Sequence, residues 1–186
     1  LTDHTQPVWA VDFHHSGDFL VSSSMDHTAK LWDFNSLRCR QTFRGHVDSI
    51  NHVCFQPYTN NICTGSGDKT VSIWDIRSGL CVQTFYGHMN AVNNVNFNLA
   101  GSNIASCDAD GVVKIWDVAS GSVLCTLRGH EAKVLDLEWM GSTLVSASAD
   151  YRVGIWVCRG SKTHLRGWFQ GHRRAVNTIA LSMDGA

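Results

Sequence analysis

A histidine recurs at one fixed interval from end to end of this chain. Each copy lies 42 residues after the one before it, at His4, His46, His88, His130 and His172. Tryptophans keep step with them, because Trp32, Trp74 and Trp116 each follow their histidine by 28 residues. Self-similarity with a period of roughly 20–50 residues is typical of stacked repeats, in which each unit buries its apolar face against the next. The spacing therefore predicts a repeat protein.

The fourth copy departs from this spacing in a way that separates the repeating unit from its loops. Trp156 follows His130 by only 26 residues, yet His172 comes at the usual interval. Loops absorb such losses and gains. We therefore expect a single domain over 1–186, with repeats at approximately 4–45, 46–87, 88–129 and 130–171 and a partial repeat at 172–186.

Alternation of apolar and polar side chains predicts four short antiparallel strands in each repeat. In the second repeat, an irregularity near Asn51 and His52 interrupts the first strand, and Gly67-Asp68-Lys69 forms a tight hairpin. No helix is expected. The expected strands are 8–13, 19–24, 28–32, 39–43, 50–55, 62–66, 70–74, 81–85, 92–97, 104–107, 112–116, 123–127, 134–139, 144–148, 153–156 and 165–169, followed by one extra strand at 175–181.

Composition narrows the classes of partner and compartment. The net charge of -1 gives no electrostatic basis for binding nucleic acid or anionic lipid. No apolar run approaches the roughly 18 residues needed to span a membrane. The seven cysteines are odd in number and never form a Cys-x-x-Cys pair, which argues against a disulfide framework and a zinc site. We expect a reducing, cytoplasmic location, and we interpret the start at Leu1 as a sign of a fragment.

The repeated residues resemble a known family. Gly45-His46, a unit of four strands and Trp74-Asp75 together resemble the WD-repeat β-propeller signature, and the likeness covers the whole chain. It implies an all-β, open propeller of four four-stranded blades plus one extra strand. In this family a His, Ser/Thr, Asp, Trp tetrad braces each blade. Carried over, the tetrads are His4, Ser22, Asp26 and Trp32; His46, Thr64, Asp68 and Trp74; His88, Ser106, Asp110 and Trp116; His130, Ser146, Asp150 and Trp156.

The His, Ser and Asp of each tetrad also match the residue types of a hydrolase triad. A triad is needed once, whereas this set recurs four times at nearly equal spacing. Each set also has a Trp, whose indole N–H needs an acceptor when it is buried. We therefore expect internal braces, no enzyme activity, and no catalytic residue, metal or cofactor.

Partner binding is expected on the face that carries the Gly-His loops. The resemblance places contacts at the residues three and five after each His and at the residue before the tetrad Asp. The candidates are Pro7, Trp9, Met25, Ser49, Asn51, Ala91, Asn93, Lys133 and Leu135. Trp9 is the strongest, because a Trp beside Met25 is a plausible hot spot. The alternative is that Trp9 packs within its own blade.

Two functions in the binding class follow from finer resemblances. Runs within 1–118, such as Pro7-Val8-Trp9-Ala10 and Ile104-Ala105-Ser106-Cys107, resemble the sperm-associated antigen 16 family of the axonemal central pair. That likeness implies a non-enzymatic scaffold in the cytoskeleton of cilia or flagella, with axonemal or microtubule-associated partners. The alternative is a substrate receptor or adaptor of a cullin-RING ubiquitin ligase, because Trp74-Asp75-Ile76-Arg77 resembles a Trp-Asp-x-Arg docking element.

Four blades and one strand do not obviously close a ring, and family members commonly have seven blades. An open arc exposes apolar blade faces. We therefore expect either further blades or self-association to cover them.

Overall fold

The computed structural model describes residues 2–159 and 162–182, and every regular element in that part of the chain is a strand. None of these residues belongs to a helix long and apolar enough to cross a membrane. The strands are β1 Val8–Phe13, β2 Phe19–Ser24, β3 Thr28–Asp33, β4 Arg38–Arg44, β5 Ile50–Phe55, β6 Asn61–Ser66, β7 Val71–Asp75, β8 Cys81–Phe85, β9 Val92–Phe97, β10 Asn103–Asp108, β11 Val113–Asp117, β12 Val123–Leu127, β13 Val134–Met140, β14 Thr143–Ser148, β15 Val153–Arg159 and β16 Lys162–Phe169.

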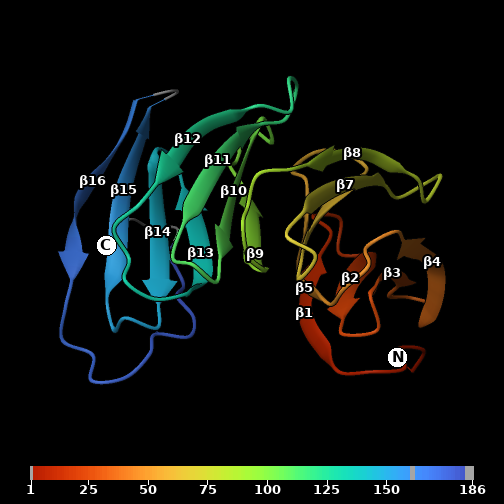
Figure 1. Cartoon of the computed structure of the whole chain (residues 1–186). Coiled ribbons are helices and arrows are strands. Elements are labelled where there is room, and N and C mark those ends of the chain that lie inside the picture. The colour runs from red at the N-terminus through yellow and green to blue at the C-terminus, as the bar shows by residue number, and fades with distance from the viewer. Residues whose placement is uncertain (1, 160–161, 183–186) are drawn as a thin grey trace.

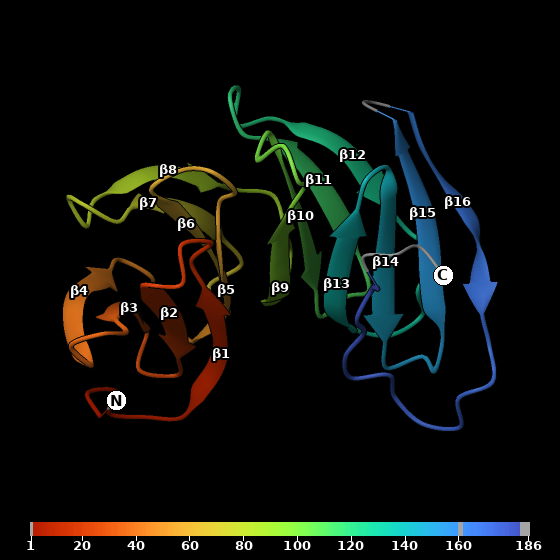
Figure 2. The same ribbon diagram turned by 180° about the vertical axis from the view of Figure 1, so that it is seen from behind.

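The strands form four antiparallel sheets of four strands each, and every sheet is a simple meander in chain order. We call the sheets blades 1 to 4. The first strands of successive blades contact one another, and the fourth strands lie on the outside of the arc (Figure 1). Seen from behind, blades 1 and 4 again lie at opposite ends of the arc (Figure 2). The prediction of an all-β, open propeller with four four-stranded blades is confirmed.

Local sequence accounts for the hairpins and irregularities within each blade. The turn between the second and third strands places one residue at positive φ in every blade, namely His27, Lys69, Gly111 and Tyr151. This left-handed geometry reverses the chain within a few residues. The register of β5 with β6 shifts between Ile50 and His52, as the sequence predicted. Such a bulge increases the local twist of the strand that carries it.

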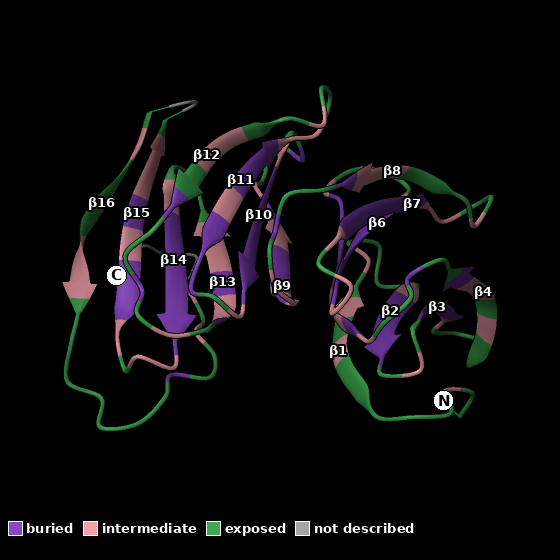
Figure 3. Cartoon of the chain, in the orientation of Figure 1, coloured by how far each residue is buried: buried purple, intermediate pink, exposed green. Residues whose placement is uncertain are grey.

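The hydrophobic core lies between the blades. Blade 1 contributes Val21, Ala29, Leu31 and Phe43 to a cluster that packs against blade 2, whose side is formed by Ile50, Val53, Phe55, Ile62 and Trp74. Equivalent clusters join blade 2 to blade 3 and blade 3 to blade 4. Figure 3 shows the result: the second strands are almost entirely buried, whereas β1 and the outer strands are mostly exposed or partly buried. Burying each large aliphatic side chain contributes about 1.5–3 kcal/mol.

The free face of blade 1 shows what an uncovered blade exposes. Val11 is 57% exposed, while its repeat equivalents Val53 and Val95 are fully buried against the preceding blade. Val8 and Phe13 beside it are 47% and 52% exposed. Blade 1 therefore exposes apolar side chains whose equivalents in blades 2 and 3 are buried.

The expected extra strand at 175–181 is not a strand in the structure. The segment nevertheless follows the path of a first strand, since the amide of Val176 donates to the carbonyl of Ser148 at 3.1 Å. Val176 and Ile179 also cover the far face of blade 4. A strand needs a hydrogen-bonded partner, and within 2–159 and 162–182 no second strand of a fifth blade pairs with this one.

Candidate functional site

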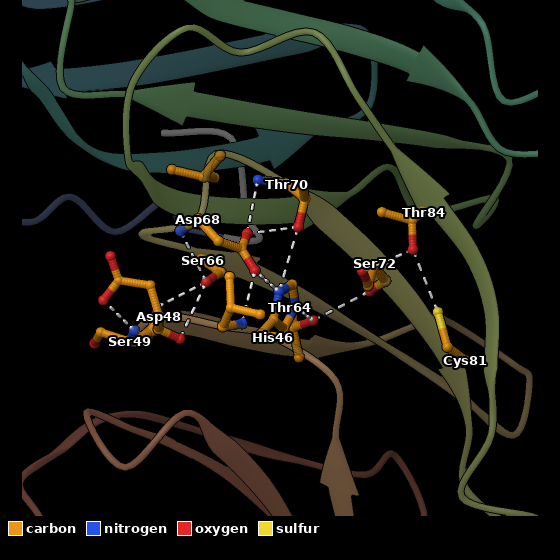
Figure 4. A network of polar contacts seen from close by, with 12 residues as sticks. His46, Asp48, Ser49, Thr64, Ser66, Asp68, Thr70, Ser72, Cys81 and Thr84 are labelled. Carbon is orange, nitrogen blue, oxygen red and sulfur yellow. Dashed lines mark hydrogen bonds and ion pairs between the residues drawn. The ribbon is translucent and has the colours of Figure 1, made fainter.

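The repeated histidine of blade 2 lies at the centre of a buried chain of hydrogen bonds (Figure 4). Its Nδ1 lies 2.7 Å from Oδ2 of Asp68, and its Nε2 lies 2.7 Å from Oγ1 of Thr64. The indole N–H of Trp74 donates to the same Thr64 oxygen at 2.8 Å. One assignment satisfies every atom: Nδ1–H donates to the carboxylate, and Nε2 accepts from the hydroxyl. The tetrad thus ties the Gly-His loop to β6, β7 and the hairpin between them.

Blades 1 and 4 repeat this geometry. His4 contacts Asp26 at 2.8 Å and Ser22 at 2.7 Å, and Trp32 donates to Ser22 at 2.8 Å. In blade 4 the corresponding distances are 2.8, 2.7 and 2.9 Å among His130, Asp150, Ser146 and Trp156. The structure brings together every residue that the resemblance assigned to these two blades.

Blade 3 differs from the expectation at its carboxylate. Nδ1 of His88 lies 2.7 Å from Asp108, two residues before the expected Asp110. The rest of the tetrad is present, since Ser106 contacts His88 at 2.6 Å and accepts from Trp116 at 2.7 Å. Asp110 is exposed and accepts only a side-chain bond from Asn90 at 2.9 Å. The assignment of Asp110 to the tetrad is therefore corrected to Asp108.

The residue type two positions before the usual tetrad aspartate explains why Asp108 takes its place. In the other blades that position is a serine, Ser24, Ser66 or Ser148, whose Oγ accepts from the backbone amide of the tetrad Asp. Asp108 occupies the serine position and accepts from the amides of Asp110 and Val112 at 3.0 and 2.9 Å. Asp108 thus makes both the bond to the histidine and the bond to the turn amide, which in the other blades come from an aspartate and a serine. An aspartate at the serine position was the signal in the sequence.

Electrostatics favour an ionised aspartate in each of the four tetrads. Burial by itself would raise the pKa of Asp68, but hydrogen bonds from His46 and Thr70 outweigh it and hold that pKa well below its usual value. The pKa values of the other three tetrad aspartates are lowered in the same way. Burial lowers the pKa of His130, against the opposing effect of its bond to Asp150.

This arrangement is unsuited to nucleophilic catalysis. The hydroxyl-bearing residue is 3% exposed in blade 1 and fully buried in the other blades, at Ser22, Thr64, Ser106 and Ser146. Each hydroxyl accepts an indole N–H and donates to the imidazole in a buried position, so a substrate cannot reach it in the way a nucleophilic triad requires. Among the residues that the structure describes, no group of three or more His, Cys, Asp or Glu is placed to hold a metal ion. The tetrads act as braces.

The glycine before the histidine has a steric role in blades 2 and 3, whereas blade 1 has Asp3 at this position. A Cβ at Gly45 would lie 2.9 Å from Cη2 of Trp74, which is closer than real Cβ atoms come. At Gly87 the distance to Cη2 of Trp116 would be 3.3 Å. In these two blades the loop approaches the tetrad Trp more closely than a side chain at the glycine would allow. This close approach explains why Gly-His recurs as a pair.

A family model, described as the WD domain, G-beta repeat, matches residues 1–33, 37–75, 79–117 and 121–157. The chain belongs to the WD-repeat family. Among similar proteins, coatomer subunit beta'-2 of Arabidopsis thaliana is 45% identical over 59 residues, which are 31% of this chain and 6% of that protein. Polyadenylation factor subunit 2 of Gibberella zeae is 41% identical over 56 residues, 30% of this chain and 9% of that protein. The chain thus covers under a tenth of these relatives' length.

The loop face of this WD-repeat arc carries an anchored aromatic side chain. Trp9 is 55% exposed, yet its indole N–H donates across the blade boundary to Oγ of Ser49 at 2.9 Å. Ser49 in turn donates to Asn51 at 3.0 Å. Trp9 therefore contacts blade 2 instead of packing only within its own blade. Met25 is 44% exposed on the same blade.

Two of the expected contact residues join neighbouring blades. The side-chain amide of Asn51 donates to the backbone carbonyl of Val92 at 2.8 Å, and the side-chain amide of Asn93 donates to the backbone carbonyl of Val134 at 2.7 Å. The sequence did not reveal this role, nor that of Asp136, which accepts from Asn94 and from the backbone of Ile179. Pro7 and Lys133 are exposed, whereas Ala91 and Leu135 are partly buried.

Proposed function

We propose that this chain is a non-enzymatic scaffold that binds another protein through the loop face around Trp9. WD repeats typically serve protein interaction, and the observation that carries the proposal here is the anchored indole of Trp9. Its bond to Ser49 fixes the ring before binding while leaving 55% of the residue exposed. A preorganised aromatic loses little conformational entropy on binding, which is what distinguishes a hot spot from an incidental exposed ring.

The test is capture of partners from a lysate by the parent and by Trp9→Ala, with binding of each captured protein measured in purified form. Truncating a hot spot costs about 2 kcal/mol or more, so Trp9→Ala is expected to weaken binding at least about thirtyfold. Tyr58 is 74% exposed in a loop away from this face, which makes Tyr58→Ala a matched control. Equal binding by Trp9→Ala and the parent would refute the proposal.

We further propose an axonemal setting in the cytoplasm, with a ubiquitin-ligase adaptor as the alternative. The axonemal reading rests on sequence runs within 1–118, and the alternative on exposed Arg77 after Trp74-Asp75. Co-purification separates the two. Tubulin and central-pair proteins support the scaffold, whereas a cullin adaptor that is lost on Arg77→Ala supports the ligase.

The exposed face of blade 1 supports a neighbour as well. Val8, Val11 and Phe13 occupy positions that the other blades bury, so we propose that a further blade or a second copy covers them. Light scattering tests this for the chain by itself. A monodisperse monomer at high concentration would contradict self-association.

A further inference from the structure

The space beside the tetrad Trp, between the third and fourth strands, is filled differently in the four blades. It is lined by one residue of the third strand and its partner directly opposite on the fourth. The four pairs are Lys30 with Thr42, Ser72 with Thr84, Lys114 with Thr126, and Gly154 with Trp168. Side chains that are directly opposite in an antiparallel pair lie on the same face. Blade 2 is the blade in which both members are small.

Lysine side chains fill this space in blades 1 and 3. Nζ of Lys30 donates to Oγ1 of Thr42 at 3.1 Å and to Asp3 at 2.7 Å, and the residue is only 5% exposed. Nζ of Lys114 donates to Oγ1 of Thr126 at 3.1 Å and lies 6.0 Å from the centre of the Trp116 ring. The two blades thus hold an ammonium group in the same way, with the outer-strand threonine as acceptor.

Blade 4 fills the space with an aromatic ring and again places a cation beside it. The ring of Trp168 lies 5.8 Å from that of Trp156, and a Cβ at Gly154 would come within 3.0 Å of it. The guanidinium of Arg152 lies 4.8 Å from the centre of the Trp168 ring. Three of the four blades therefore carry a basic side chain at this place.

Blade 2 has a groove of about 430 Å³ at the corresponding place. Ser72, Thr84 and Trp74 line its floor, and the apolar side chains of Val47, Leu80 and Tyr86 line its rim. Figure 4 shows Thr84 turned toward Ser72 and Cys81. Thr84 occupies the position of Thr42 and Thr126, which accept from lysine in blades 1 and 3. Arg44 and Asp68, which carry opposite charges, also line the groove.

The outer strand beside this groove differs from its counterpart in blade 1. Val82 of β8 and Leu80, which directly precedes this strand, are 61% and 68% exposed. The matching edge of β4 carries Arg38 and Arg40, and charged side chains on an edge strand discourage pairing with another chain. The edge of β8 has no such charge, so it favours an extended segment lying alongside.

We propose that the blade 2 groove binds a lysine side chain of a partner protein, presented by an extended segment that lies along β8. The ammonium group donates to Thr84, as Lys30 and Lys114 do to Thr42 and Thr126 in their own blades. The lysine stem packs on the ring of Trp74, which also attracts the cation. Apolar neighbours of the lysine contact Leu80 and Val82. This site is separate from the Trp9 surface.

The test measures binding of the peptide acetyl-Thr-Val-Lys-Val-Thr-amide, and of the same peptide with norleucine in place of lysine, by calorimetry. We expect the lysine peptide to bind at least about tenfold more tightly, which corresponds to about 1.4 kcal/mol. Ser72→Lys should abolish binding, since the new side chain fills the groove as Lys30 and Lys114 fill theirs. Asn60→Lys adds the same charge outside the groove lining and should bind like the parent.

Circular dichroism of Ser72→Lys is expected to match the parent, because blades 1 and 3 already fold with lysine at this position. Trp9→Ala should still bind the lysine peptide, which separates this site from the proposed scaffold surface. No binding of the lysine peptide, equal affinity for the two peptides, or undiminished binding by Ser72→Lys would overturn the proposal.

Discussion

Replacing the tetrad carboxylate of blade 3 distinguishes the structural assignment from the one based on spacing. Asp108 is 1% exposed and accepts three hydrogen bonds, from Nδ1 of His88 and the amides of Asp110 and Val112. Hydrogen bonds to a charged group contribute about 1.5–3 kcal/mol each. Their sum overestimates the loss, because the hairpin relaxes and some donors reach water. Asp108→Ala leaves three buried donors without an acceptor, at about 1–3 kcal/mol each, and we expect a loss of about 3–5 kcal/mol.

The spacing of the other blades predicts the opposite order. It assigns the brace to Asp110, so Asp110→Ala would be the damaging change. In the structure Asp110 is exposed and its side chain accepts one bond, from Asn90. Surface substitutions of this kind change stability by about 0.5 kcal/mol or less. Urea unfolding followed by circular dichroism and tryptophan fluorescence measures both variants. Equal losses, or a larger loss for Asp110→Ala, would refute the structural assignment.

A further pair of variants tests why the carboxylate moved. Asp108→Ser restores the serine found in the other blades and leaves Asp110 where their tetrad aspartates stand. We expect Asp110 to take over the bond to His88, so Asp108→Ser should cost less stability than Asp108→Ala. The double change Asp108→Ser with Asp110→Ala should lose this rescue. If the single and double variants unfold at the same urea concentration, Asp110 does not replace Asp108.

Three further predictions concern the frame. The free energy of unfolding should drop as the pH falls below about 6.5, where the lowered pKa of His130 begins the loss, and more steeply below about pH 4, where the unfolded chain protonates its aspartates before the tetrads do. An unfolding midpoint unchanged between pH 7 and pH 3 would contradict this. Gly45→Ala should cost about 1–3 kcal/mol through its clash with Trp74, measured by thermal unfolding. A Cβ at Gly167 meets nothing within 4 Å, so Gly167→Ala is the control, and an equal loss at both positions would exclude the clash. Asn51→Ala should cost about 0.5–1.5 kcal/mol because its bond to Val92 joins two blades, and exposed Asn60→Ala, its control in urea unfolding, should cost less.

The sequence predicted the frame because the frame repeats. Each tetrad joins residues from four different segments, in blade 2 His46, Thr64, Asp68 and Trp74. The sequence spacing between them is therefore set by the lengths of the strands and turns that bring them together. Four copies of that interval specify the blade and its hairpins. Spacing did not identify Asp108, because two carboxylates stand two residues apart and only the loop geometry decides which one reaches the histidine.

Other features depended on contacts between units and were not readable from one repeat. Asn51 looked like a surface residue because it follows the Gly-His loop. Its amide instead reaches the carbonyl of Val92 because the first strands of adjacent blades contact one another. The segment at 175–181 has the apolar alternation of a strand, but alternation supplies only a face to bury. It does not supply the second strand that pairing requires.

The positions at which blades differ without disturbing the frame are where specific binding is expected. Lys30, Ser72 and Lys114 occupy the same register in the third strand of their blades, and the tetrads beside them keep the same bonds among histidine, hydroxyl and tryptophan. The frame therefore accommodates either lysine or serine at this position in blades 1 to 3. It does decide whether the space beside the tryptophan is filled from within or left open to a partner. The same logic applies to Trp9, which stands where Asn51 and Asn93 join blades and instead presents a ring to solvent.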